Sequence, residues 1–286
     1  MQHSDTQVAA WAASNDRMWQ DTGTVDFWRT WHRPWDQMVQ QATDLLAEAA
    51  GITAGDRVLD LGSGHGEPAL TFAHRVGPTG HVTATDVSPA MLALASDNLA
   101  AAPSANVALA VADAEHLPFA SGVFDRVTSR FGLMYVPNPV RACAEAHRVL
   151  RPGGTVAFAV WGPGHRVPWY AGAMRVFMQY LLLPPLDPDA PGPFRFGAPG
   201  SLTTVLNSAA FSNVREDTHE ITLTWPGDVR SFVAFLEAMH CGLIAQIPDR
   251  HHQRVHEQLH AACTFAADSD VVRLHATIVV ASARKP

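Results

Sequence analysis

The chain has 286 residues, of which 47% are hydrophobic and 16% charged, a balance typical of a globular protein with one large domain or two small ones. Its net charge is -7 and its 20 lysine and arginine residues form no basic run, so we expect no nucleic acid and no membrane as partner and favour a small-molecule substrate. Three widely spaced cysteines fit neither a zinc site nor a disulfide framework, and the N-terminus lacks the basic start and apolar stretch of a signal peptide. Together these features predict a cytoplasmic protein.

The first fifty residues are expected to form a helical lid. Apolar residues recur at helical spacing through residues 33–51, which predicts a helix that begins after Pro34 and ends at Gly51. Five aromatic side chains crowd together just before this helix and at its start: Trp19, Phe27, Trp28, Trp31 and Trp35. Trp35 is as well placed to fix the helix to the core as to contact a ligand. The other four are predicted to cover bound ligands.

Short apolar runs alternate with helical patterns between residues 57 and 161. The runs, which have the character of buried strands, are residues 57–62, 81–87, 106–114, 124–132 and 154–161. The segments with helical spacing are residues 67–76, 88–102 and 139–150. Strands that alternate with helices predict a parallel sheet covered on both faces.

Later segments are expected to complete this sheet and to cover one end of it. Residues 213–225 and 273–284 have strand character and are predicted to close the sheet as an antiparallel pair. Residues 163–200, rich in proline and glycine, and residues 227–270, helical with several histidines, fall where loops at the strand ends would lie and are predicted to form a cap.

The predicted fold class is therefore α/β: a Rossmann-like, seven-stranded, mostly parallel sheet with helices on both faces, an N-terminal helical lid and helical cap insertions. We expect a single domain over residues 1–286. Its parts are a lid (1–50), a core (51–162), cap insertions (163–200 and 227–270) and a closing helix and strands (201–226 and 271–286).

The sequence VLDLGSGHGEPAL, residues 58–70, ends a strand in alternate glycines and continues into a helix. Gly62, Gly64 and Gly66 would bring bare backbone, and the free N–H groups of the helix, close to a ligand. The plainer alternative is a tight turn without a ligand. A dinucleotide fingerprint would place a further glycine where Glu67 stands, so NAD and FAD are disfavoured. Asp86, at the end of the second strand, is placed to accept hydrogen bonds from the hydroxyls of a free ribose.

Four segments resemble the class I S-adenosylmethionine-dependent methyltransferases, in particular the group similar to the ubiquinone/menaquinone-biosynthesis methyltransferases. They are VLDLGSGHGEPAL, VTATDVSPAML, VADAEHLPFASGVFDRVTSRFGLMYVPNP and HRVLRPGGTVAFAVW, and the resemblance covers residues 51–162 closely. It implies S-adenosylmethionine as the cofactor. It also implies the cofactor residues: Gly62, Ser63 and Gly64, preceded by Asp60, at the methionine part; Asp86 at the ribose; Val87 and Met91 beside the adenine; Asp113 and Ala114 at the adenine amino edge; and Arg130 and Phe131 at the methionine end.

Outside these segments the chain departs from the quinone-pathway enzymes. Those enzymes end the fifth strand with a Glu and a Ser, whereas here it ends AVWGPGH, and only WHRPW, with His32 and Trp35, echoes their N-terminal pattern. We therefore expect methyl transfer to a carbon or oxygen of a small, largely apolar or aromatic metabolite of secondary metabolism. A quinone-pathway C-methyltransferase and a non-catalytic S-adenosylmethionine-binding protein remain as alternatives.

The acceptor site is expected between lid and cap. Methyl transfer depends mainly on positioning and exclusion of water, and a sulfonium attracts aromatic faces. Trp19 is accordingly assigned to the cofactor. The substrate is assigned to Trp28, Trp31, Tyr135, Trp169 and His240.

A general base would assist transfer to a hydroxyl or an acidic carbon, and histidine is the usual one. We assign this role to His165, in the loop after the fifth strand, or to His32, in the lid; the alternative is that His165 is exposed to solvent. The helical spacing of His251, His252, His256 and His260 is typical of a solvated face and only weakly indicates a metal site, so no metal is expected.

Overall fold

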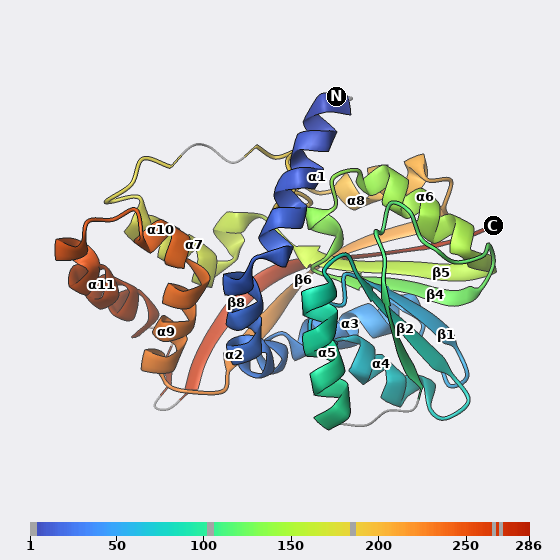
Figure 1. The fold of residues 1–286 in the computed structure, drawn as a ribbon, viewed down its shortest axis with the longest axis horizontal. Helices are drawn as coiled ribbons and strands as arrows, with labels where there is room; N and C mark the ends of the chain where they lie inside the picture. Colours follow the sequence, from blue (N-terminus) through green and yellow to red (C-terminus); the bar gives the residue numbers. More distant parts are fainter. Residues whose placement is uncertain (1–4, 102–105, 184–186, 265–266, 269–270) are drawn as a thin grey trace.

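One sheet forms the centre of the computed structural model, which describes residues 5–101, 106–183, 187–264, 267–268 and 271–286 (Figure 1). Its strands are β1 (Arg57–Leu61), β2 (His81–Asp86), β3 (Val107–Val111), β4 (Phe124–Arg130), β5 (Leu150–Trp161), β6 (Ser212–Trp225), β7 (Ala267–Asp268) and β8 (Val271–Arg284). Their order is β3-β2-β1-β4-β5-β8-β6, and the two-residue β7 pairs with β8. This confirms the predicted seven-stranded sheet, to which β7 is a short addition.

The direction of the strands also follows the prediction. Strands β1 to β5 pair in parallel, and β8 runs antiparallel to both β5 and β6. The sheet order reverses between β1 and β4, which lie side by side, so the carboxyl ends of these two strands flank a crevice. In open parallel sheets, ligands bind at this kind of crevice.

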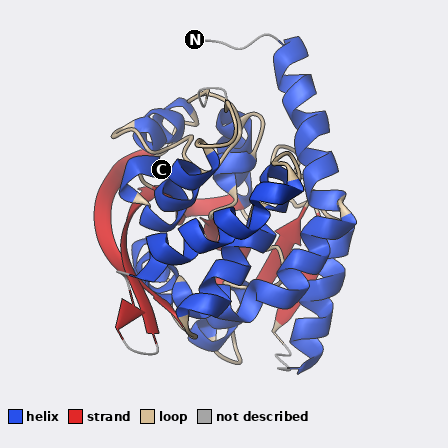
Figure 2. Cartoon of the chain, turned by 90° about the vertical axis from the view of Figure 1, so that its left-hand side faces the viewer, coloured by secondary structure: helices blue, strands red, loops and turns tan. Residues whose placement is uncertain are grey.

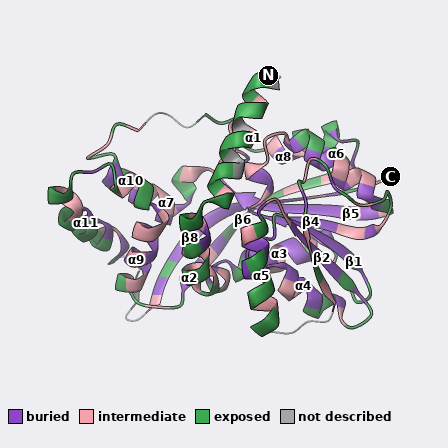
Figure 3. Cartoon of the chain, in the orientation of Figure 1, coloured by how far each residue is buried: buried purple, intermediate pink, exposed green. Residues whose placement is uncertain are grey.

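Helices cover both faces of the sheet, which is why its central strands are buried on both sides (Figures 2 and 3). Those connecting the parallel strands are α4 (Ala69–Val76), α5 (Pro89–Ala101) and α6 (Pro139–Val149). Helix α6 packs against α8 (Ser201–Ser208), while α3 (Gln40–Ala50) lies against β4, β5 and β8 (Figure 1). Among the described helices, none has the length and apolar character that crossing a bilayer requires.

The N-terminal segment consists of α1 (Asp5–Gln20) and α2 (Thr22–Met38), followed by α3. The prediction that a helix begins after Pro34 is wrong, because Pro34 lies inside α2, whose N-cap is Asp21. Trp28, Trp31 and Trp35 continue one packed face across the proline, and this packing outweighs the loss of one backbone hydrogen bond. The predicted end at Gly51 is confirmed, since Gly51 caps α3 in the left-handed conformation.

Four helices gather at the end of the sheet where β6 and β8 extend furthest (Figure 1). They are α7 (Pro168–Phe177), α9 (Val229–Met239), α10 (Cys241–Ile244) and α11 (His252–Thr264), and we call them the cap. Helix α11 packs against α7 and α9, and the apolar side chains of these helices join the main core. Three short 3-10 helices complete the described elements: η1 (Leu133–Tyr135), η2 (Gly164–Arg166) and η3 (Asp249–His251).

Candidate functional site

The glycine-rich turn after β1 needs bare backbone for a conformational and a steric reason. Gly62, Gly64 and Gly66 have φ angles of 68°, 54° and 108°, in the region that disfavours side chains. A Cβ atom on Gly62 would also lie 3.3 Å from the Cα atom of Gly132, which follows β4. The backbone of the turn is therefore held against the next strand and exposes no side chain at Gly62 or Gly64.

Asp60 supports this turn from beneath. Its carboxylate is fully buried and accepts hydrogen bonds from Ser63 Oγ at 2.6 Å and Thr128 Oγ1 at 2.8 Å. Burial raises the pKa of Asp60 to about 6. Asp60 does not line the cavity described below, so it shapes the turn without reaching a ligand there.

Asp86 ends β2 beside the turn. Its Oδ2 atom accepts a hydrogen bond from Gly64 N and its Oδ1 atom one from Ser88 N, both at 2.9 Å. Burial raises the pKa of this carboxyl, although both backbone bonds oppose the shift. Asp86 thus joins the glycine turn to the start of α5, and its carboxylate borders the same crevice.

A cavity of about 1210 Å³ extends from this crevice to the cap. Most of the predicted cofactor residues line it: Trp19, Gly62, Ser63, Gly64, Asp86, Val87, Met91, Asp113, Ala114, Arg130 and Phe131. Four of the predicted substrate residues line it as well: Trp28, Tyr135, Trp169 and His240. The fold therefore brings residues of the lid, the sheet and the cap around one space.

Three other predicted site residues lie elsewhere. Trp31 packs against the core, where its ring centroid lies 5.9 Å from that of Trp225 and 5.8 Å from that of Phe235. His165 is exposed in η2, because the loop after β5 turns it away from the interior, and it does not line the cavity. Neither Trp31, which was assigned to the substrate, nor His165, which was assigned as the base, lines the cavity.

His32 is the third. It is half-buried on α2, where its Nδ1 atom lies 3.0 Å from the carbonyl oxygen of Trp28, one helical turn earlier. Burial lowers its pKa. His32 does not line the cavity, so the structure does not bring this predicted base to the acceptor side.

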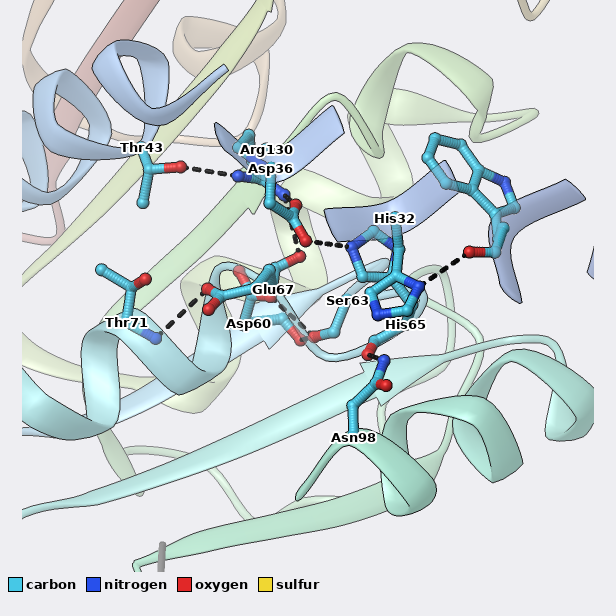
Figure 4. A network of polar contacts seen from close by, with 11 residues as sticks. His32, Asp36, Thr43, Asp60, Ser63, His65, Glu67, Thr71, Asn98 and Arg130 are labelled. Carbon is cyan, nitrogen blue, oxygen red and sulfur yellow. Dashed lines mark hydrogen bonds and ion pairs between the residues drawn. The ribbon is translucent and has the colours of Figure 1, made fainter. Parts of the chain in front are cut away.

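A buried polar network that no sequence pattern indicated connects the lid to the glycine turn (Figure 4). Asp36 of α2 lies 2.9 Å from His65 Nε2 and accepts a hydrogen bond from Arg130 at 2.8 Å. Arg130 also donates to Thr43 Oγ1 and to the carbonyl oxygen of Glu67. Burial acts to raise the pKa of Asp36, but His65 and Arg130 lower it below its ordinary value. Asp36 lies off the apolar face that the helical spacing predicts, so nothing in the sequence indicates this contact.

The cap side of the cavity is aromatic with a few polar groups. Phe131 and Trp161 stack face to face at 4.4 Å, and Trp169 packs edge-on to Trp161. Tyr135, from η1, and His240, from the end of α9, add a hydroxyl and an imidazole to this wall. Tyr170, which no sequence pattern indicated, adds a second hydroxyl from α7. Such a wall suits a largely apolar ligand with a small number of polar atoms.

The cofactor side suits a nucleoside more than a dinucleotide. Asp86 and Glu67 both line it, and Asp113 lies at its edge with the side chain half exposed. Carboxylates repel phosphate, whereas they accept hydrogen bonds from ribose hydroxyls and amino groups. Within the described ranges, no group of three or more His, Cys, Asp or Glu side chains is placed to hold a metal ion.

Comparison with known proteins gives the same picture of the core. A family model described as a methyltransferase domain matches residues 59–158. The chain is 40% identical to the ubiquinone/menaquinone biosynthesis C-methyltransferase UbiE of Ralstonia pickettii (strain 12J), over 46% of this chain and 53% of that protein. It is also 40% identical to the protein of that name from Ectopseudomonas oleovorans, over 43% of this chain and 69% of that protein. The match to the first of these covers only about half of that relative's length.

Solved structures extend the likeness to most of the chain. The structure of the [4+2]-cyclase SpnF is similar with a TM-score of 0.55 and 25% identity, over 88% of this chain and 82% of that one. Phosphoethanolamine N-methyltransferase 2 of Haemonchus contortus, in complex with S-adenosyl-L-methionine, gives a TM-score of 0.57 at 19% identity, over 95% of this chain and 60% of that one. At 19% identity, the similarity to this second structure concerns the fold alone. Together these comparisons confirm the predicted resemblance.

Proposed function

The chain belongs to the S-adenosylmethionine-dependent methyltransferases, and we propose that it methylates a small, largely apolar or aromatic metabolite of secondary metabolism. The observation that carries this proposal is that one cavity contains both the glycine turn with Asp86 and the aromatic wall of the cap. At about 1210 Å³ it exceeds the roughly 300–1,000 Å³ typical of single-ligand pockets, which leaves room for two ligands side by side.

The residues of the cofactor side fit S-adenosylmethionine. The left-handed backbone at Gly62 and Gly64 leaves space for an amino-acid moiety, and Asp86 offers carboxylate oxygens to a ribose. When bound, this cofactor supplies an electrophilic methyl group on a sulfonium. Trp19 and Trp28 line the cavity, and an aromatic face in reach of a sulfonium attracts it by roughly 0.5–2 kcal/mol.

The cap side would position the acceptor. Tyr135, Tyr170 and His240 provide polar anchors, while Trp161 and Trp169 provide apolar surface. Holding two reactants in line is worth on the order of 7–11 kcal/mol, so an acceptor fixed by this wall would gain much of its rate from positioning. The aromatic wall that β5 and the cap form supports the proposal of a substrate from secondary metabolism rather than a quinone precursor.

A second candidate follows from the likeness to the [4+2]-cyclase SpnF, which extends over 88% of this chain. In this alternative the cofactor stays intact and the aromatic wall folds a bound polyene for ring closure. The same cavity would serve both reactions, but only methyl transfer consumes the cofactor.

The test is incubation of the purified protein with methyl-deuterated S-adenosylmethionine and a small-molecule extract of the source organism, followed by mass spectrometry. We expect one extract component to gain a labelled methyl group as S-adenosylhomocysteine accumulates. His165→Ala, an exposed change outside the cavity, is the control and should match the parent. A changed component without label and with intact cofactor would favour the cyclase. Calorimetric binding of NAD but not of S-adenosylmethionine would contradict both.

A further inference from the structure

His240 differs from the other histidines of the cavity in how its ring is held. It follows α9, and its Nδ1 atom lies 2.8 Å from the carbonyl oxygen of Leu236. A carbonyl only accepts hydrogen bonds, so Nδ1 carries the proton and the lone pair of the neutral ring lies on Nε2. Among the described residues, no side chain or backbone group bonds to Nε2. The backbone of the cap thus fixes the tautomer of His240.

The surroundings of His240 keep it neutral. The residue is 9% exposed and packs against Tyr170 and Phe177 of α7, with ring centroids 6.3 and 5.3 Å away. Burial lowers its pKa, the bond to Leu236 opposes this, and no charged group contributes. Tyr170 is the titratable group that faces it from α7, and Cys241 follows it at the start of α10. The pKa of Tyr170 is itself raised by burial, so this neighbour is uncharged at neutral pH.

The two other histidines of the cavity have acidic partners on the cofactor side. His65 belongs to the glycine turn, bonds to Asp36 through Nε2 and stacks on Trp28 at 5.3 Å. His116 contacts Asp113 through Nδ1 and Arg141 through Nε2. Neither lies on the cap. His240 therefore combines a free lone pair with a place on the acceptor side.

We propose that His240 is the general base of the reaction and that the acceptor atom is the oxygen of an aromatic hydroxyl. This inference rests on the proposed methyl transfer and names its substrate class. The hydroxyl oxygen forms a bond to the methyl carbon as the carbon–sulfur bond breaks and its electron pair stays on sulfur. The hydroxyl proton moves to Nε2, which gives a methyl ether, S-adenosylhomocysteine and an imidazolium that returns its proton to solvent. The apolar wall suits the aromatic ring of such an acceptor, and a neutral base suits its weakly acidic hydroxyl.

The first test needs no turnover and uses the protein loaded with S-adenosylhomocysteine. The probes are 2-naphthol and 2-methoxynaphthalene, which differ in the one proton that Nε2 would accept. Loss of one hydrogen bond corresponds to about 0.5–1.5 kcal/mol, so His240→Phe should weaken 2-naphthol binding roughly 2- to 10-fold and leave 2-methoxynaphthalene unchanged. His165→Phe is the matched control and should alter neither affinity. If the parent fails to bind 2-naphthol, or if His240→Phe weakens both probes equally, the assignment is overturned.

A second test reads the ring directly. Nitrogen-15 NMR of histidine-labelled protein, with the His240 signals identified from their absence in His240→Phe, should show a protonated Nδ1, a bare Nε2 and a pKa below 6.5. A proton on Nε2 at neutral pH would remove the base and with it the proposal.

A third test uses the acceptor found with the labelled cofactor. The product should be a methyl ether, and His240→Gln should lose about 10²- to 10⁴-fold in kcat while its affinity for S-adenosylhomocysteine stays within about twofold. A carbon-methylated product, or parental turnover by His240→Gln, would overturn the assignment of His240 but leave methyl transfer intact. If no labelled product forms at all, the proposed function itself fails, while the NMR result on the ring still stands separately.

Discussion

The imidazole of His65 lies 2.9 Å from the carboxylate of Asp36, so the glycine turn is joined to helix α2 by a hydrogen bond between side chains that are both largely buried. Arg130, at the end of β4, bonds to the other oxygen of the same carboxylate. One acidic group of the lid thus holds the two segments between which the cofactor crevice opens.

Replacing Asp36 with alanine should destabilise the protein strongly, because it leaves Arg130 buried without its ion-pair partner. Breaking one side of a buried pair typically costs about 3–5 kcal/mol, which urea unfolding would measure. Asp44→Ala is the control: its pair with Arg75 is 46% and 35% exposed and should contribute about 1 kcal/mol or less. Equal losses in the two variants would mean that the network does not stabilise the fold.

The contribution of Asp36 should also depend on pH. Its pKa in the folded protein is lowered below 3.8, so its stabilising effect is complete above that value and is lost as the pH falls through the folded pKa. The difference in free energy of unfolding between the parent and Asp36→Ala should therefore shrink in acid. A difference that stays constant down to the acid limit of folding would contradict the lowered pKa.

Asp60 should show the opposite dependence. Its pKa is raised from 3.8 to about 6, so within that window the folded protein keeps a proton that the unfolded chain has released, and stability falls as the pH rises. Asp60→Asn cannot ionise, so relative to the parent it should gain on the order of 3 kcal/mol in unfolding free energy between about pH 4 and about pH 7. Asp97→Asn, an exposed change on α5, is the comparison. Parallel pH profiles for Asp60→Asn and the parent would show that Asp60 ionises normally.

Gly62→Ala should impair both stability and cofactor binding. A left-handed residue other than glycine costs roughly 1–2 kcal/mol, and here the new Cβ atom would also press on Gly132 at 3.3 Å. Gly51→Ala isolates the first effect, since Gly51 has a similar φ of 64° and nothing lies within 4 Å of its Cβ position. Thermal unfolding and calorimetry with S-adenosylhomocysteine should show the larger loss at Gly62. Indistinguishable variants would argue against a tight approach of the turn to Gly132.

Asp86→Ala should weaken S-adenosylhomocysteine binding roughly tenfold or more, because a hydrogen bond to a charged group contributes about 1.5–3 kcal/mol. The change also deprives Gly64 N and Ser88 N of their acceptor. Asp113→Ala, at a side chain that is 49% exposed, should have a smaller effect by the same calorimetry. Parental affinity in Asp86→Ala would refute the proposed placement of the ribose.

The sequence was informative wherever local pattern determines structure. The parallel strands, their connecting helices and the left-handed Gly51 all follow from spacing and residue type. The position of a residue along the chain did not predict whether it lines the cap side of the cavity. His165 lies in the loop after β5, yet it is exposed, and Trp31 shares the aromatic segment of the lid, yet it packs against the core.

Contacts between distant segments could not be predicted from a single sequence. Periodicity indicates which face of a helix is buried but not which residue it meets, so the pairing of Asp36 with His65, 29 positions away, left almost no trace. Likewise, the helical spacing of α9 does not reveal that His240, at its end, borders the cavity beside Tyr170.

Part of the cap side of the cavity comes from stretches of the chain that contribute nothing to the glycine turn, and this has a consequence for how the protein can diversify. The crevice with the glycine turn, Asp86 and Asp113 is complete before β5 ends, whereas Trp169, Tyr170 and His240 belong to insertions that leave the sheet after β5 and after β6. Exchange of those insertions between homologues would replace Trp169, Tyr170 and His240 and leave the glycine turn and its supporting aspartates untouched. Under the proposed function, a change of these insertions would alter which acceptor is bound without altering the binding of the methyl donor.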